Sequence, residues 1–168
     1  MHGIVGFIKL LLRNDHIDGW MVCDGSLLPV AEYPQLFDKV RYRFGGEGDH
    51  FALPTMELPG GFAFVRVYES PEDEAARLQG WTPKDMMSQV SPYAGEDEPA
   101  GWMECDGREL SIRDNYLLAT LVGPRFGGDG LKTFALPNMP SQGGIRFMIC
   151  IDGADPNQQP GAGGSDDD

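Results

Sequence analysis

The stretch Gly19-Trp20-Met21-Val22-Cys23-Asp24-Gly25 is repeated 82 residues later as Gly101-Trp102-Met103-Glu104-Cys105-Asp106-Gly107. At this offset, residues 19–48 and 101–130 share 14 identities in 30 positions, where average composition gives about two by chance. A fixed period of this kind is the signature of a duplicated structural unit. We therefore expect two copies of one small fold, each with its own self-contained core.

The similarity continues toward the end of each copy. After one inserted residue, Phe51-Ala52-Leu53-Pro54 recurs as Phe134-Ala135-Leu136-Pro137. A Gly-Gly pair, at residues 60–61 and 143–144, then precedes a closing apolar run in both copies. We predict a first unit at residues 1–69, a linker at 70–82, a second unit at 83–152 and an acidic, glycine-rich tail at 153–168.

Glycine and proline set the expected fold class. With 23 glycines and 13 prolines in 168 residues, the backbone must turn often, which favours short strands over long helices. Asp24-Gly25 and Asp106-Gly107 predict turns, because Asp accepts hydrogen bonds from nearby backbone N–H groups and Gly tolerates positive φ. The expected fold is α+β and β-rich, with short strands, one short helix and glycine-rich loops in each unit.

One short helix per unit is predicted from apolar residues three or four positions apart. The expected apolar faces consist of Val30, Tyr33, Phe37 and Val40 in the first unit and Ile112, Tyr116, Ala119 and Val122 in the second. Pro34 suits the first turn, Ser111 with Asp114 resembles a capping box, and Pro124 is expected to stop the later helix. Ser70–Asp73 in the linker also has the features of a helix start.

The closing segments 62–68 and 145–151 alternate in the manner of strands. Arg66 and Arg146 fall at different phases of these two strands, so the units are expected to present different surfaces.

The three cysteines, Cys23, Cys105 and Cys150, do not form a disulfide framework, since their number is small and odd. Cys105 and Cys150 lie in the same unit and could pair if the fold brings them close together. The favoured interpretation is buried free thiols that behave as small apolar residues.

Charge and hydropathy exclude several partners. The net charge of −13 and the pI of about 4.5 oppose binding to phosphate backbones, so no nucleic acid partner is expected. No apolar run approaches the roughly 20 residues that span a bilayer, so no membrane insertion is expected either.

The ordered series Gly-Trp-x-x-Cys-Asp-Gly, short helix, Phe-Gly-Gly-x-Gly and Phe-Ala-Leu-Pro resembles the phage tail-collar domain, which also occurs in microcystin-dependent-type proteins. It appears twice, and its residues are taken as structural: Trp20, Cys23, Asp24, Gly25, Gly45, Gly46, Gly48, Phe51 and Pro54, then Trp102, Cys105, Asp106, Gly107, Gly127, Gly128, Gly130, Phe134 and Pro137. The resemblance implies a β-rich module of tail fibres and spikes, often trimeric, with no reaction. The Asp-Leu-Arg-Gly stretch that usually follows in the family is absent from both copies.

Catalytic interpretations are weaker. The glycine loops lack the flanking strand, helix and Lys-Ser or Lys-Thr pair of a phosphate site, so no cofactor is expected. Asp24 and Asp106 would form a glycosidase pair only if the units faced each other across a groove, and a local turn role is favoured. No zinc-site spacing is present, and Asp49 with His50 is the best local metal candidate. We therefore expect neither a metal site nor catalytic residues.

Differences between the copies are the better candidates for function. Around the glycine loop, Arg41, Tyr42, Arg43, Asp49 and His50 of the first unit stand at the place of Gly123, Pro124, Arg125 and Leu131-Lys132-Thr133 in the second. The candidate binding residues are Arg41, Tyr42, Arg43, Asp49, His50 and Lys132. Such a tip on a stiff scaffold suits binding of a sugar or of a neighbouring subunit. An ordinary solvated loop is the alternative.

Together these observations predict a structural and adhesive protein of a phage or phage-like particle. It would sit in a tail fibre, a spike or a capsid decoration, be assembled in the host cytoplasm, and contact host surface glycans. The expected partners are further copies of the chain, most simply in a trimer, and other virion or fibre proteins. The alternatives are a subunit of a bacterial extracellular filament and, less favoured, a glycan-active enzyme.

Overall fold

A computed structural model of the chain describes residues 4–12, 16–69, 71 and 87–153. The elements of the first half are β1 (Ile8–Leu11), β2 (Trp20–Val22), β3 (Leu27–Pro29), α1 (Pro34–Val40), β4 (Gly46–Glu47), β5 (His50–Ala52), β6 (Glu57–Leu58) and β7 (Gly61–Arg66). Those of the second half are β8 (Val90–Tyr93), β9 (Trp102–Glu104), β10 (Glu109–Ser111), α3 (Tyr116–Val122), the 3-10 helix η1 (Gly123–Phe126), β11 (Thr133–Ala135) and β12 (Arg146–Cys150). The predicted α+β, β-rich fold is confirmed.

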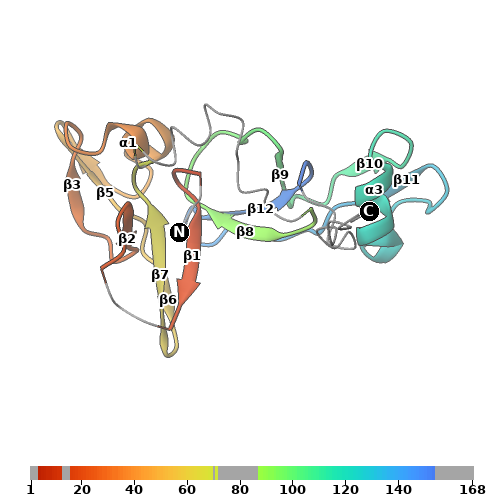
Figure 1. The fold of residues 1–168 in the computed structure, drawn as a ribbon, viewed down its shortest axis with the longest axis horizontal. Coiled ribbons are helices and arrows are strands. Elements are labelled where there is room, and N and C mark those ends of the chain that lie inside the picture. The colour runs from red at the N-terminus through yellow and green to blue at the C-terminus, as the bar shows by residue number, and fades with distance from the viewer. Residues whose placement is uncertain (1–3, 13–15, 70, 72–86, 154–168) are drawn as a thin grey trace, which may run out of the picture.

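The two halves repeat one topology. In the first, β7 is the central strand and pairs antiparallel with β1 and β2, and in the second β12 pairs in the same way with β8 and β9. A second small sheet follows in each half, with β3 on β5 and β10 on β11. In Figure 1 the first half lies on the left and the second on the right, and β1 and β8 meet between them.

Backbone hydrogen bonds match across the copies, which fixes the structural equivalence. The N–H of Arg66 donates to the carbonyl of Phe7 at 2.9 Å, and the N–H of Cys150 donates to the carbonyl of Gln89 at 2.8 Å. Phe7 is therefore equivalent to Gln89, and Arg66 to Cys150. Arg146 instead matches Phe62 in the strand register, four residues before the position of Arg66. Because side chains alternate along a strand with a period of two, the two arginines lie in the same phase at different positions, and the prediction of different phases is wrong.

The glycine loops are backbone turns in both copies. Gly46 has φ of +92° and Gly128 has φ of +89°. A Cβ on Gly46 would lie 2.5 Å from the carbonyl oxygen of His50, and one on Gly128 would lie 2.6 Å from Cα of Phe134. The strand that follows each loop thus passes too close for any side chain, which explains why glycine is retained in both copies.

The two helices form where they are predicted, but their buried faces differ in part. Leu36 and Val40 are buried in α1, and Leu118, Ala119 and Val122 are buried in α3. Tyr116, predicted to face the core, is 70% exposed, because it occupies the first helical position, the one that Pro34 takes in α1. Tyr33 and Phe37 are only partly buried.

The helix ends also differ from the prediction. The Ser111–Asp114 pair makes only a 3.4 Å turn contact, and the N-cap of α3 is Asn115. The helix ends at Gly123, which has φ of +66°, and Pro124 starts the 3-10 helix that follows. Gly123 therefore stops α3, one residue before the predicted proline.

The cores of the two halves are not self-contained, contrary to the expectation. The main cluster of the first half includes Ala94 and Ile145 from the second. A further cluster joins Phe7 of the first half to Tyr93, Trp102, Met148 and Cys150 of the second. The Phe7 ring centroid lies 4.8 Å from that of Tyr93 and 4.5 Å from that of Trp102. A small unit has little apolar interior of its own, and sharing side chains enlarges it.

The packing of Phe7 against Tyr93 and Trp102 is called the joint between the halves. Polar contacts reinforce this joint. Phe7 and Tyr93 form an antiparallel bridge, and the N–H of Ala94 donates to the carbonyl of Gly6 at 2.9 Å. The ammonium of Lys39, at the end of α1, lies 2.6 Å from the carboxylate of Asp97.

All three cysteines are free and buried, as predicted. Burial raises the pKa of the Cys23 thiol to about 12 and that of Cys105 to about 11. Both thiols are therefore neutral at physiological pH, and no disulfide joins Cys105 to Cys150.

Some predictions fall outside the described residues. These are the tail after residue 153, the linker apart from Pro71, and with it the helix start at Ser70–Asp73. The exact boundaries of the units stay a prediction.

We expect Gly46→Ala to lower the free energy of unfolding by about 2–4 kcal/mol, because the new methyl group overlaps the backbone of β5. Gly48→Ala is the matched control. Gly48 also has positive φ, but a Cβ there meets nothing within 4 Å, so it should cost about 1 kcal/mol. Urea denaturation followed by tryptophan fluorescence measures both values, and equal losses would contradict the close-approach argument.

We expect Phe7→Ala to destabilise the protein by about 3–5 kcal/mol, because removal of the ring leaves a cavity in the joint between the halves. The side chain of Phe7 is only 5% exposed, whereas that of Phe62 is 36% exposed. Phe62→Ala should therefore cost about 1 kcal/mol or less. Thermal unfolding of Phe7→Ala should also separate into two transitions, and a single unshifted transition would show that the joint does not couple the halves.

Candidate functional site

Four of the predicted binding residues lie together at the tip of the first unit. Tyr42 donates from its hydroxyl to the carbonyl of Gly48 at 2.6 Å, and its ring lies edge-on to Phe37. Arg41 forms a 2.9 Å ion pair with Asp38. The Tyr42 hydrogen bond joins the segment after α1 to the glycine loop, and the other two contacts hold that segment against α1.

Asp49 and His50 complete this tip. The Nδ1 atom of His50 lies 2.8 Å from a carboxylate oxygen of Asp49, and this hydrogen bond lowers the pKa of Asp49. The side chain of Asp49 is 94% exposed and that of His50 is 48% exposed. Among the described residues, no group of three or more His, Cys, Asp or Glu side chains is placed to hold a metal ion.

The remaining two predicted binding residues lie elsewhere. Arg43 and Phe44 approach Gly144 of the second half, where an added Cβ would lie 3.3 Å from Nε of Arg43. Lys132 precedes β11, at the end of the molecule opposite β5 (Figure 1). The structure therefore gathers Arg41, Tyr42, Asp49 and His50 at one tip, and it places Arg43 and Lys132 apart from them.

Asp129 organises the corresponding loop of the second unit, a role that was not predicted from the sequence. One carboxylate oxygen accepts the backbone N–H groups of Leu131, Lys132 and Thr133 at 2.9, 2.7 and 2.8 Å. These bonds lower the pKa of Asp129 to about 2. The available signal was an acidic residue two positions before the segment 131–133, which contains the inserted residue.

The aspartates of the Asp-Gly turns have the predicted backbone role. Asp24 accepts the N–H of Ser26 at 2.9 Å and its hydroxyl at 2.6 Å. Asp106 accepts the N–H of Arg108 at 3.0 Å. In each copy, the same carboxylate oxygen closes the turn that ends the Trp-containing strand.

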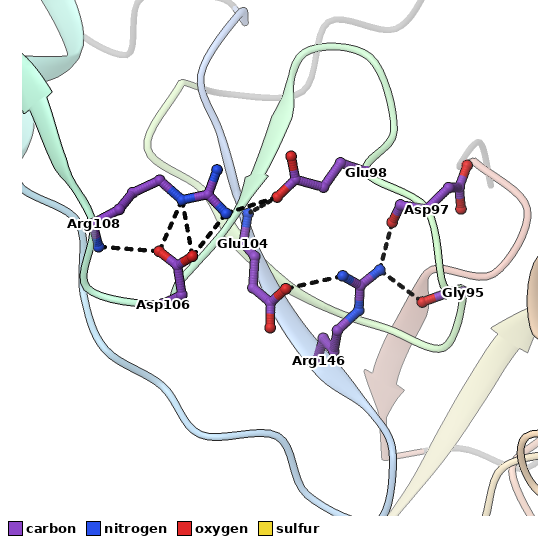
Figure 2. Close-up of polar contacts among 7 residues, drawn as sticks. All are labelled: Gly95, Asp97, Glu98, Glu104, Asp106, Arg108 and Arg146. Carbon is purple, nitrogen blue, oxygen red and sulfur yellow. Dashed lines mark hydrogen bonds and ion pairs between the residues drawn. The ribbon is translucent and has the colours of Figure 1, made fainter.

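The side chain after this turn differs between the copies, and the second copy builds an ion network on it (Figure 2). The Nη2 atom of Arg108 lies 2.7 Å from Asp106 and 2.9 Å from Glu98, and its Nε bonds both oxygens of Asp106. Hydrogen bonding to Asp106 is the main cause that raises the pKa of Arg108. Asp106 was predicted as a turn residue, whereas no sequence pattern pointed to Arg108.

A second arginine anchors the acidic loop after β8. Arg146 forms a 2.9 Å ion pair with Glu104 and donates to the carbonyls of Gly95 and Asp97 (Figure 2). Its side chain is only 12% exposed. The carboxylate of Asp97 accepts the hydroxyl of Tyr93 and faces Lys39 of the first half. Arg146 thus holds the loop that meets α1.

The first unit carries a groove beside Trp20. Its volume is about 490 Å³, and its lining includes His16, Trp20, Asp24, Ser26, Tyr33 and Tyr68. The hydroxyl of Tyr68 donates to the carboxylate of Asp18 at the edge of this groove. No sequence pattern marked the groove in advance.

Comparison with known proteins places these features in a family. The family model of the phage tail collar domain matches residues 6–58 and 88–142. No curated protein and no solved structure matches the chain. No helix among the described residues is both long and apolar enough to cross a membrane.

We expect the Asp129 carboxyl to titrate near pH 2 rather than at its ordinary value of 3.8, because three N–H groups stabilise its charged form. A depressed pKa means that this stabilisation is fully present above about pH 3.8 and is lost as the pH falls toward 2. Carbon-detected NMR of the carboxyl measures the midpoint. In Asp129→Asn, the amide signals of residues 131–133 should lose this low-pH transition, and an unshifted carboxyl midpoint would contradict the geometry.

Proposed function

The chain belongs to the phage tail collar domain family, a structural family of phage tails, and we propose that it is a structural and adhesive protein of a phage or phage-like particle. Its position would be in a tail fibre, a spike or a capsid decoration. The observation that carries this proposal is the double match, which covers well over half of the chain.

The proposed role is non-catalytic. Both Asp-Gly carboxylates are used within their own turns, and Asp106 is also bound by Arg108. An acid–base pair for glycoside cleavage needs carboxyls free to exchange protons at the scissile bond. The low pKa of both aspartates, to which hydrogen bonds from Ser26 and Arg108 contribute most, does not suit a general acid.

We propose that the chain associates with itself, most simply as a trimer, and with other virion or fibre proteins. Support comes from large apolar side chains that are exposed on the second unit. Tyr116 is 70% exposed, Phe126 is 51% exposed and Leu131 is 86% exposed. Contact with a neighbouring subunit would remove such side chains from water.

The host ligand proposed for the tip of the first unit is a surface glycan. Arg41, Asp49 and His50 expose hydrogen-bonding groups beside the ring of Tyr42, which is 43% exposed. Polar groups next to an aromatic ring suit a sugar, whose hydroxyls are polar and whose C–H faces are apolar. Arg43 and Lys132 would act outside this cluster.

We also propose that the chain is divided into two units at residues 1–69 and 83–152, with a linker at 70–82 and a tail at 153–168. Two similar units in one chain suit two similar positions in a symmetric assembly.

The protein should be found in purified particles together with capsid or tail proteins. Mass spectrometry of gradient-purified particles and gold-labelled antibody in electron micrographs test this directly. Light scattering of the isolated chain should give three times its mass of 18.4 kDa. Recovery in fibres that lack capsid and tail proteins would instead support the extracellular filament.

Cosedimentation with host capsular polysaccharide tests the adhesive role. We expect Tyr42→Ala with His50→Ala to reduce binding at least fivefold, because these changes remove the ring and a polar group from the tip. Arg113→Ala, at an exposed position of the other unit that is not among the candidate binding residues, is the control and should bind normally. Unchanged binding by the double variant would show that the tip does not bind the polysaccharide. Shortening of the polysaccharide would point to an enzyme.

A further inference from the structure

Three residues of the groove in the first unit have equivalents in the second that form an ion network. His16, Asp24 and Ser26 line the groove, and at the repeat offset of 82 residues their equivalents are Glu98, Asp106 and Arg108. In the second unit, Arg108 extends from its turn across Asp106 to Glu98 (Figure 2). A guanidinium group therefore spans the place that corresponds to the mouth of the groove.

In the first unit, Ser26 is too short to reach across. Its N–H and hydroxyl both donate to one oxygen of Asp24, and the other oxygen of that carboxylate has no hydrogen bond among the described residues. Asp24 is exposed and its pKa is lowered, chiefly by the Ser26 hydroxyl. The groove thus offers a charged carboxylate at the position where the second unit binds its own arginine.

We propose that this groove binds the guanidinium group of an arginine side chain from a neighbouring protein, in the way that the second unit binds Arg108. The identity of that neighbour as a component of the particle rests on the proposed function. The arginine would pair with Asp24 and lie against Tyr33 and Tyr68, which are half-buried in the groove wall. Guanidinium groups both pair with carboxylates and stack on aromatic rings.

Charge supports a cationic occupant. The chain carries a net charge of −13, which attracts basic partners during encounter. Asp18, at the edge of the groove, adds a second carboxylate and is bonded to the hydroxyl of Tyr68.

A sugar suits the groove less well than an arginine. Sugars bind by laying a ring face on an exposed aromatic ring, and Trp20 is only 3% exposed. Lys9 and Arg66 already lie over the Trp20 ring, at 5.2 and 5.5 Å from its centroid. The largest aromatic side chain of the groove is therefore engaged within the unit.

Titration of the full-length protein with N-acetyl-arginine amide, followed by amide NMR, tests the proposal. We expect shift changes at residues 24–26, Tyr33 and Tyr68. The citrulline analogue, which has the same shape but no charge, should produce changes at least fivefold smaller. The changes should weaken when the salt concentration rises from 50 to 500 mM, since exposed ion pairs are screened.

Two variants make the test specific. Ser26→Arg gives the first unit the side chain of the second, so it should fill its own groove and abolish the response while leaving the spectrum folded. Arg108→Ser opens the second copy, so new shift changes should appear at Glu98 and Asp106. Asp24→Asn keeps the oxygen that closes the turn but removes the charge, and it should reduce the response at least fivefold.

Equal responses to the arginine and citrulline probes would overturn the proposal, as would an undiminished response in Ser26→Arg. A response to methyl N-acetylglucosaminide but not to arginine would also overturn it, and would assign the groove to a glycan. Arginine binding by a chain that is absent from purified particles would keep the site and reject the assembly partner. Presence in particles without arginine binding would reject the site alone.

Discussion

The packing of Phe7 between Tyr93 and Trp102 is the contact on which the arrangement of the two halves depends. It comes from the segment just before β1, so the first half supplies a core side chain to the second. Ala94 and Ile145 make the reverse contribution. An ion pair between Lys39 and Asp97 adds a polar contact between the same two halves. Two units that each lack a large interior are thereby stabilised as a pair.

The two copies share one backbone framework, but their surfaces differ. The Asp-Gly turn, the tight glycine loop and the central strand recur with matching hydrogen bonds. Side chains that the framework does not use have diverged, as Ser26 and Arg108 show. In one copy the residue after the turn lines a groove, and in the other it is an arginine that forms an internal ion network.

The repeat predicted the strands, turns and helices well, because those features depend on local residue patterns present in both copies. It did not predict the joint, since nothing in the periodicity distinguishes Phe7 from any other apolar residue near a strand. Leu36 and Leu118, identical in the two copies and buried in both helices, were a usable signal, whereas spacing alone selected the exposed Tyr116. The groove and the Asp129 loop depend on side-chain reach and loop geometry, which a linear pattern does not encode.

The joint also has a direction. Gln89 occupies in the second unit the position that Phe7 occupies in the first, and its exposed side chain bonds Ser91 instead of offering an aromatic ring. A unit placed after the second one would therefore receive no aromatic side chain equivalent to Phe7. This contact orders the two units as donor and acceptor, and the second unit cannot repeat it toward another neighbour.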